Sequence, residues 1–73
     1  MIVKRRDLVR RIAQRSAELD VSWRLLRQGA GHEVFILDGQ NVLIPRHREL
    51  NEITALAILK QCEAKLGTRW WRV

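Results

Sequence analysis

The sequence predicts an α+β fold in which two helices flank three consecutive strands, in the order α-β-β-β-α. Apolar residues recur at helical spacing near both ends of the chain, whereas the middle contains short apolar runs separated by turn residues. The dipeptide Asp38-Gly39 separates two of these runs and is typical of a two-residue hairpin turn. The simplest packing is a three-stranded antiparallel sheet with two helices on one face.

The first helix is predicted over residues 4–19. Leu8, Ile12 and Leu19 recur at helical spacing and form its apolar stripe. The residues that follow favour extended structure, so we expect this helix to end near Asp20.

The middle of the chain predicts three strands, over residues 22–28, 32–37 and 41–44. Two glycines within residues 29–31 favour a turn between the first and second strands. Asp38-Gly39 favours a type I′ turn between the second and third, because that turn needs a positive φ angle at both central residues. Such a turn sets which residues lie opposite each other in the hairpin: Leu37 and Gln40, Phe35 and Val42, His32 and Pro45.

Side chains alternate across a sheet, so the predicted hairpin has two distinct faces. One face carries His32, Val34, Ile36 and Leu43, and the other carries Phe35, Leu37, Val42 and Ile44. Both faces are apolar near their centres. The sequence therefore leaves open which of them packs against the helices.

A second helix is predicted to begin after Asn51, a favourable N-cap residue, and to end at Gly67. One apolar stripe runs along it through Ala55, Ile58, Leu59, Cys62 and Leu66. We expect residues 1–73 to form a single domain, with a core over residues 4–67 and a short aromatic and basic tail over residues 68–73.

The chain is strongly basic, with 14 Lys and Arg against eight Asp and Glu and a formal net charge of +6. Most of these cations are Arg, whose planar guanidinium matches the oxygens of a phosphate. Nucleic acid is therefore the first partner to expect, and an anionic membrane surface the second. An acidic protein partner and an ordinary basic surface are the remaining explanations.

Cys62 is the single cysteine, which excludes an intrachain disulfide and a zinc site built from several thiolates. A lone thiol fits the reducing cytosol. No stretch approaches the roughly 20 apolar residues of a membrane span. Lys4 follows the first apolar residues at once, without the apolar run that an export signal needs, so we expect a cytoplasmic protein.

His32 is the first candidate for chemistry, because it follows a glycine-containing turn at the start of a predicted strand. Histidine is the side chain best suited to accept or donate a proton in a physiological reaction. With RNA as the partner, the natural reaction is attack of a ribose 2′-hydroxyl on the adjacent 3′-phosphate, which needs acid–base groups and positive charge around phosphorus. One His and several Arg supply these without a metal or another cofactor. A His that merely forms a hydrogen bond at a strand end is the alternative.

Several basic residues are candidates for binding phosphate. Arg27 and Arg46 flank His32 in the predicted structure and are the strongest of them. His47 is a second proton-transfer group, a phosphate contact or part of a solvated loop. The wider set comprises Arg24, Arg48 and an N-terminal cluster that is either an RNA contact or a solvated helix face: Lys4, Arg5 and Arg6.

Other polar and aromatic residues are weaker candidates. Glu33 is adjacent to His32 in sequence but should point to the other face of the sheet, so we do not assign it as a partner base. The tryptophans could stack on bases, although the spacing of Trp23 favours the core, and Trp70 and Trp71 favour packing or a partner contact.

Together these residues resemble the HicA family of toxins. The motifs are Arg-Gln-Gly-Ala-Gly-His-Glu-Val-Phe over residues 27–35, Asp38-Gly39, Pro-Arg-His-Arg-Glu-Leu over residues 45–50, and Thr54 followed by Ile-Leu-Lys-Gln over residues 58–61. The resemblance extends roughly from residue 5 to residue 67. One position departs from the pattern, since Gly31 stands where many members have Ser.

The resemblance implies a fold similar to a double-stranded-RNA-binding domain. It also implies a metal-independent endoribonuclease that cleaves mRNA, arrests translation and is neutralised by a HicB-type antitoxin protein. In this chain the single essential histidine of the family corresponds to His32. If Val34, Ile36 and Leu43 are exposed beside His32, they would suit docking of the antitoxin.

Two other functions remain open from the sequence. One is a module of the same fold that binds RNA without cleaving it, with salt-dependent affinity. The other is a protein-interaction domain whose basic surface serves an acidic partner.

Overall fold

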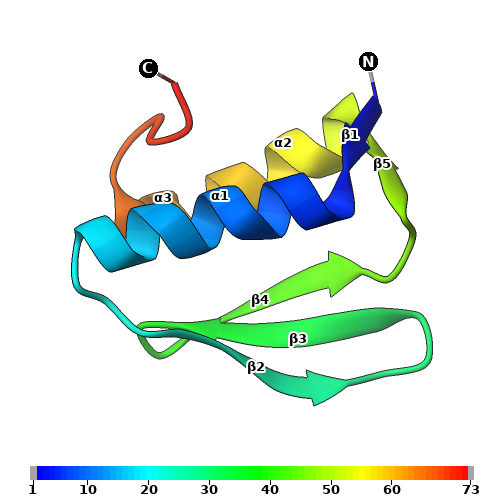
Figure 1. Ribbon diagram of the computed structural model, residues 1–73, viewed down its shortest axis with the longest axis horizontal. Coiled ribbons are helices and arrows are strands. Elements are labelled where there is room, and N and C mark those ends of the chain that lie inside the picture. The colour runs from blue at the N-terminus through cyan, green and yellow to red at the C-terminus, as the bar shows by residue number, and fades with distance from the viewer. Residues whose placement is uncertain (1, 73) are drawn as a thin grey trace.

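The computed structural model describes residues 2–72 and confirms the predicted α+β class (Figure 1). Its elements are β1 (Ile2–Lys4), α1 (Arg5–Glu18), β2 (Trp23–Gln28), β3 (His32–Leu37), β4 (Gln40–Pro45), β5 (Glu49–Asn51), α2 (Glu52–Gln61) and α3 (Glu63–Leu66). None of the helices within residues 2–72 combines the length and apolar character needed to cross a bilayer.

Strands β2, β3 and β4 form one antiparallel sheet with β3 in the centre. The β3–β4 hairpin has the predicted register, because His32 pairs with Pro45 and Phe35 pairs with Val42. Asp38 has a φ angle of 47° and the following glycine one of 88°, which are the positive values that the predicted turn requires. The β2–β3 pairing is less regular and contains a bulge in the second half of β2.

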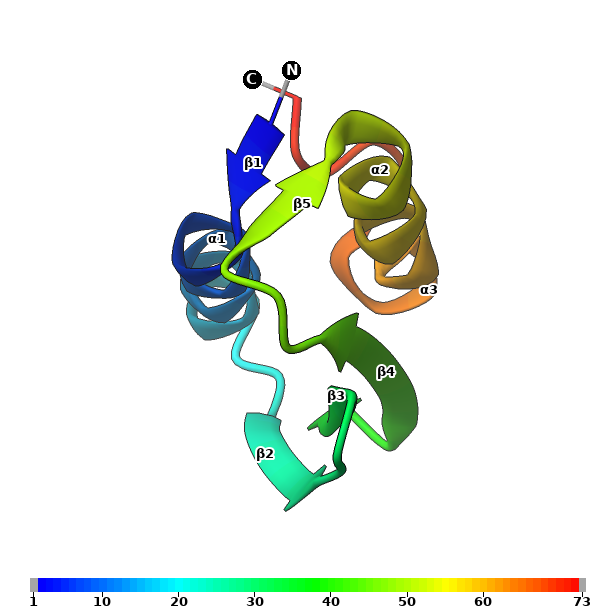
Figure 2. The same cartoon turned by 90° about the vertical axis from the view of Figure 1, so that its right-hand side faces the viewer.

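The helices lie on one face of this sheet, with α1 beside the α2–α3 pair (Figure 2). The covered face is the one that carries Phe35, Leu37, Val42 and Ile44, which settles the choice that the sequence leaves open. The helical side of the core consists mainly of Leu8, Ile12, Ile58, Cys62 and Leu66. We call the covered face the inner face of the sheet and the opposite one the outer face.

Two short strands are not predicted by the sequence analysis. β1 and β5 pair antiparallel in a separate two-stranded sheet, with Val3 opposite Leu50 and Lys4 opposite Glu49. Strands of three residues contain too little alternation for a pattern to reveal them. Their pairing holds the start of α1 against the segment that follows β4.

The predicted second helix is correct in its start but not in its continuity. Asn51 caps α2 as expected, because its Oδ1 accepts a hydrogen bond from the backbone N of Thr54 at 2.8 Å. Near its end the helix tightens, with the backbone N of Cys62 donating to Leu59 O at 3.2 Å. The chain then resumes as the short helix α3, so two helices replace the single one expected.

The expectation that Leu19 belongs to the apolar stripe of the first helix is wrong. Its side chain is 40% exposed, because α1 ends at Glu18 and the chain turns away from the core. Asp20 makes this turn with a φ angle of 57°. The last buried residue of α1 is Ser16, whose hydroxyl donates to Ile12 O at 2.7 Å.

The tryptophans are used for packing within the chain. Trp23 stacks on Phe35 with ring centroids 4.6 Å apart, which agrees with the expected core role. Trp70 packs against the core and donates from Nε1 to Leu59 O at 2.9 Å. The guanidinium of Arg11 in α1 donates to the backbone oxygen of Trp71, so the tail is attached to both α1 and α2.

Candidate functional site

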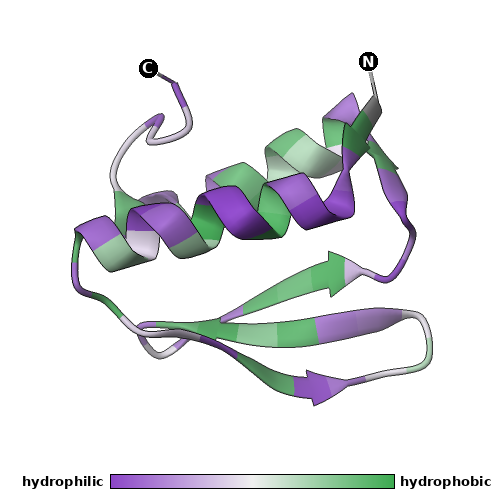
Figure 3. Cartoon of the chain, viewed as in Figure 1, coloured by the Kyte–Doolittle hydropathy of each residue, from purple (hydrophilic) through white to green (hydrophobic). Residues whose placement is uncertain are grey.

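One end of the β2–β3–β4 sheet brings together the residues selected from the sequence. The turn between β2 and β3, the end of β4 and the start of α1 all lie there (Figure 1). The start of β3 and the end of β2 are hydrophilic, in contrast to their apolar middles (Figure 3). The turn is tight, because Gly29 N donates to His32 O at 2.8 Å and a Cβ on Gly29 would lie 3.0 Å from the same oxygen.

His32 is the first residue of β3, and its side chain is exposed. The next residue, Glu33, is buried on the inner side of the sheet. Because side chains alternate along a strand, His32 lies on the outer face, away from the helices. Its imidazole makes no hydrogen bond to any of residues 2–72, so the described part of the chain engages neither ring nitrogen.

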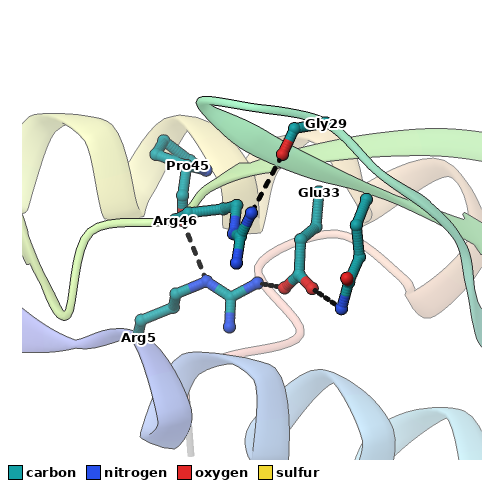
Figure 4. Close-up of polar contacts among 6 residues, drawn as sticks. Arg5, Gly29, Glu33, Pro45 and Arg46 are labelled. Atoms are coloured by element: carbon teal, nitrogen blue, oxygen red, sulfur yellow. Dashed lines mark hydrogen bonds and ion pairs between the residues drawn. The ribbon is translucent and has the colours of Figure 1, made fainter.

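Arg46 is fixed to the turn that precedes His32 (Figure 4). Its Nη1 donates to Gly29 O at 3.1 Å, and its backbone N donates to Gly31 O at 3.2 Å. A guanidinium is therefore held at the turn from which the histidine projects. Such a fixed positive charge needs little reorganisation to meet a phosphate.

Arg5 and Glu33 form an ion pair beneath this turn (Figure 4). Their side chains are 21% and 11% exposed, respectively. Glu33 also accepts a hydrogen bond from Gln28 Nε2 at 3.0 Å, and Arg5 Nε donates to Pro45 O at 2.9 Å. Burial, and after it the charge of Arg46, lowers the pKa of the Arg5 guanidinium. Arg5, selected from the sequence as an RNA contact, thus also joins α1 to the ends of β3 and β4.

An open hollow of about 610 Å³ adjoins this ion pair, and we call it the basic hollow. Its lining residues come from β1 with the start of α1, and from the loop between β4 and β5. The β1–β5 pairing brings these two segments together, and Arg5 N donates to Arg48 O at 2.9 Å. All five lining residues are cations: Lys4, Arg5, Arg6, Arg46 and Arg48.

The structure thus separates the predicted phosphate-binding residues. Arg24 and Arg27 do not line the basic hollow, and they lie on β2 opposite Ile36 and Val34, which places them on the outer face with His32. His47 is exposed in the β4–β5 loop and makes no hydrogen bond to any of residues 2–72.

The residues selected as a partner surface differ in exposure. Val34 is 6% exposed and offers almost no surface. Ile36 is half-buried, whereas Leu43 is 47% exposed. Leu26, which the sequence analysis does not select, is 46% exposed at the bulge of β2. The exposed apolar surface that the strand pairing places on the outer face therefore comes from Ile36 and Leu43.

The sequence analysis does not identify the Arg5–Glu33 pair. The sequence does indicate that Glu33 needs a partner, because the predicted register puts it on the same face as Phe35 and Leu37. A carboxylate beside an apolar face needs a positively charged partner. Nothing in the pattern selects Arg5 from the other arginines, since the contact spans 28 positions.

The arrangement combines an exposed imidazole with guanidinium groups fixed around the adjacent turn, and such a set can transfer a proton and bind a phosphate. Within residues 2–72, no group of three or more His, Cys, Asp or Glu side chains is placed to hold a metal ion. Comparisons with protein-family models, with curated proteins and with solved structures found no match for this chain.

Proposed function

We propose that this chain is a HicA-type toxin, a metal-independent endoribonuclease that cleaves mRNA and is neutralised by a HicB-type antitoxin. The family motifs over residues 27–61 support it. The observation that carries it is the attachment of Arg46 to the turn that presents His32, which puts a fixed cation beside an exposed acid–base group. The succession of α1, β2, β3, β4 and α2 further supports a fold similar to a double-stranded-RNA-binding domain.

Two proton transfers accompany the proposed cleavage. A base removes the proton of a 2′-hydroxyl, whose oxygen forms a bond to phosphorus, while the bond from phosphorus to the 5′-oxygen breaks and that oxygen takes up a proton. His32 performs one of the two transfers, and His47 or a water molecule performs the other. Arg46 stabilises the negative charge that develops on the phosphate oxygens, with Arg27 as a second contact from the outer face.

The outer face suits the proposed antitoxin. Ile36 and Leu43 expose apolar surface on the same face as His32. A protein that docks on this surface would also cover the imidazole, which is a direct way to block cleavage.

The test compares the wild-type chain with His32→Ala and with Asn41→Ala, a control at an exposed position opposite Ile36 on the outer face. Cleavage of single-stranded RNA is followed in EDTA, and growth is followed after induced expression. Loss of a general acid–base group should lower the cleavage rate by roughly 10²–10⁴-fold in His32→Ala, with Asn41→Ala unchanged.

Other outcomes would redirect the assignment. Activity that disappears in EDTA would contradict the metal-independent mechanism. RNA that every variant binds but leaves intact would identify an RNA-binding module. Equal cleavage by wild type and His32→Ala would move the chemistry to another residue.

A further inference from the structure

Most of the positive charge in the basic hollow has no ion-pair partner among the residues that the structure describes. Three of its lining residues form no ion pair within residues 2–72: Lys4, Arg46 and Arg48. A fourth, Arg6, approaches Asp7 at 3.8 Å, but both side chains are more than half exposed, so solvent screens the pair. The fifth, Arg5, shares its charge with Glu33 behind the hollow.

Two of the guanidinium groups of the hollow are held in place by hydrogen bonds to backbone oxygens. Arg5 is anchored to Pro45 O and Arg46 to Gly29 O. The two lie close enough to repel each other, and this repulsion adds to burial in lowering the pKa of Arg5. A bound anion would relieve this repulsion. Arginine commonly binds phosphate, because the N–H groups of its planar guanidinium match the spacing of the phosphate oxygens. The first turn of α1, at the same place, adds the positive end of a helix dipole.

The hollow and His32 lie on opposite sides of the sheet end. Arg5 lines the hollow and binds Glu33, which points to the inner side. His32 precedes Glu33 in β3 and therefore projects from the outer side. Arg46 lies between the two places, because it lines the hollow and is bonded to the turn that carries His32. An RNA strand that crosses this end of the sheet can therefore present one phosphate to the hollow and another to His32.

We propose that the basic hollow binds a backbone phosphate of a single RNA strand other than the phosphate that is cleaved at His32. This inference rests on the proposed function, since it takes RNA as the substrate. The hollow then contributes affinity for the strand, and the outer side performs the chemistry. Arg5 acts as a positioning residue that holds the hollow in shape.

The first test measures binding to a short single-stranded oligouridylate by fluorescence anisotropy over a range of salt concentrations. All proteins carry His32→Ala, so that the RNA stays intact. One double variant removes two exposed cations of the hollow, Lys4→Gln with Arg48→Gln. The matched control removes one Lys and one Arg at exposed positions outside the hollow, Lys60→Gln with Arg10→Gln. Circular dichroism verifies that both variants are folded.

The hollow variant should bind RNA about tenfold more weakly or worse, and the slope of log affinity against log salt should fall by about 0.7, which is one phosphate contact on a single strand. The control should keep the slope and lose at most about threefold in affinity, because it changes net charge without removing a contact. Equal weakening in the two variants would overturn the proposal. So would a hollow variant that binds inorganic phosphate worse but RNA unchanged, since the ligand would then be a free anion.

The second test measures cleavage kinetics with the same substitutions in a chain that retains His32. KM should rise about tenfold while kcat stays within about threefold, because a phosphate held equally in the ground and transition states contributes uniform binding. A fall in kcat at unchanged KM would place the scissile phosphate in the hollow and overturn the proposal. If the wild-type chain cleaves no RNA, the proposed function fails, and the binding comparison alone then decides whether the hollow holds an RNA phosphate.

Discussion

The two faces of the β2–β3–β4 sheet carry similar apolar side chains but differ in how far those side chains are buried. On the inner face, Leu37, Val42 and Ile44 are fully buried beneath the helices. On the outer face, Leu43 is nearly half exposed, although it is as apolar as its inner counterparts. Hydrophobicity therefore does not distinguish the two faces. They differ because the helices before and after the sheet cover only the inner face.

This difference has a functional meaning. The inner face ends in the buried Arg5–Glu33 pair, whereas the outer face ends in the exposed His32. One strand, β3, thus supplies a structural carboxylate and a candidate catalytic imidazole at adjacent positions. Three measurements test how strongly the two faces differ.

The largest expected effect concerns packing. Leu37→Ala removes a fully buried side chain from the inner face and should lower the free energy of unfolding by roughly 2–5 kcal/mol. A domain of this size has roughly 3–5 kcal/mol in total, so much of the variant should be unfolded. Leu43→Ala on the outer face should change the stability by less than about 0.5 kcal/mol. Urea denaturation measures both, and equal losses would mean that the outer face is also covered in solution.

The second effect concerns the ion pair at the end of the inner face. Glu33→Gln removes the charge that Arg5 faces and should lower the stability by roughly 1.5–3 kcal/mol, as for a hydrogen bond to a charged group. The control is Glu18→Gln, because Glu18 meets Arg15 at 3.3 Å on the surface and such pairs contribute about 0–1 kcal/mol. A similar loss in the two variants, measured by urea denaturation, would show that the inner pair is no more important than a surface pair.

The smallest effect concerns Cys62, which packs against the inner face and is fully buried. Burial raises the pKa of its thiol from 9.0 to about 11. The unfolded chain therefore loses its thiol proton first, and the stability that is constant below pH 9 should fall as the pH rises towards 11. At pH 10 the loss should be about 1 kcal/mol.

Cys62→Ala provides the control for this pH dependence. The variant should lose stability at every pH because of its cavity, but it should show a shallower decline between pH 8 and pH 10.5. The chain contains no tyrosine, so few other groups titrate in this range. Parallel curves for the wild type and the variant would contradict a buried neutral thiol.

Local patterns predicted most of the fold. The spacing of Leu8 and Ile12, the turn at Asp38-Gly39 and the cap at Asn51 each depend on residues close in sequence, and all three are confirmed. The division of the second helix into α2 and α3 at Cys62 was not predicted. The apolar spacing continues across Cys62, and only the backbone hydrogen-bond pattern changes there.

The candidate site was predicted in part. The register that followed from the turn placed His32 opposite Pro45, and the structure has the same pair. The sequence offered eight cationic or imidazole side chains as phosphate contacts and ranked Arg27 and Arg46 first, but it did not assign them to different sides of the sheet. The division into a hollow and an outer face depends on the β1–β5 pairing, which local patterns do not reveal.

The sequence by itself determined the α+β class, the register of the central hairpin and the placement of His32 at the start of a strand, because each follows from short-range periodicity and turn geometry. The tertiary structure alone decided which face of the sheet is buried, which arginine pairs with Glu33 and how five cations gather at one end of the sheet. These outcomes depend on contacts between segments distant in the chain, as between Arg5 and Pro45, whose separation of 40 positions leaves no local signal.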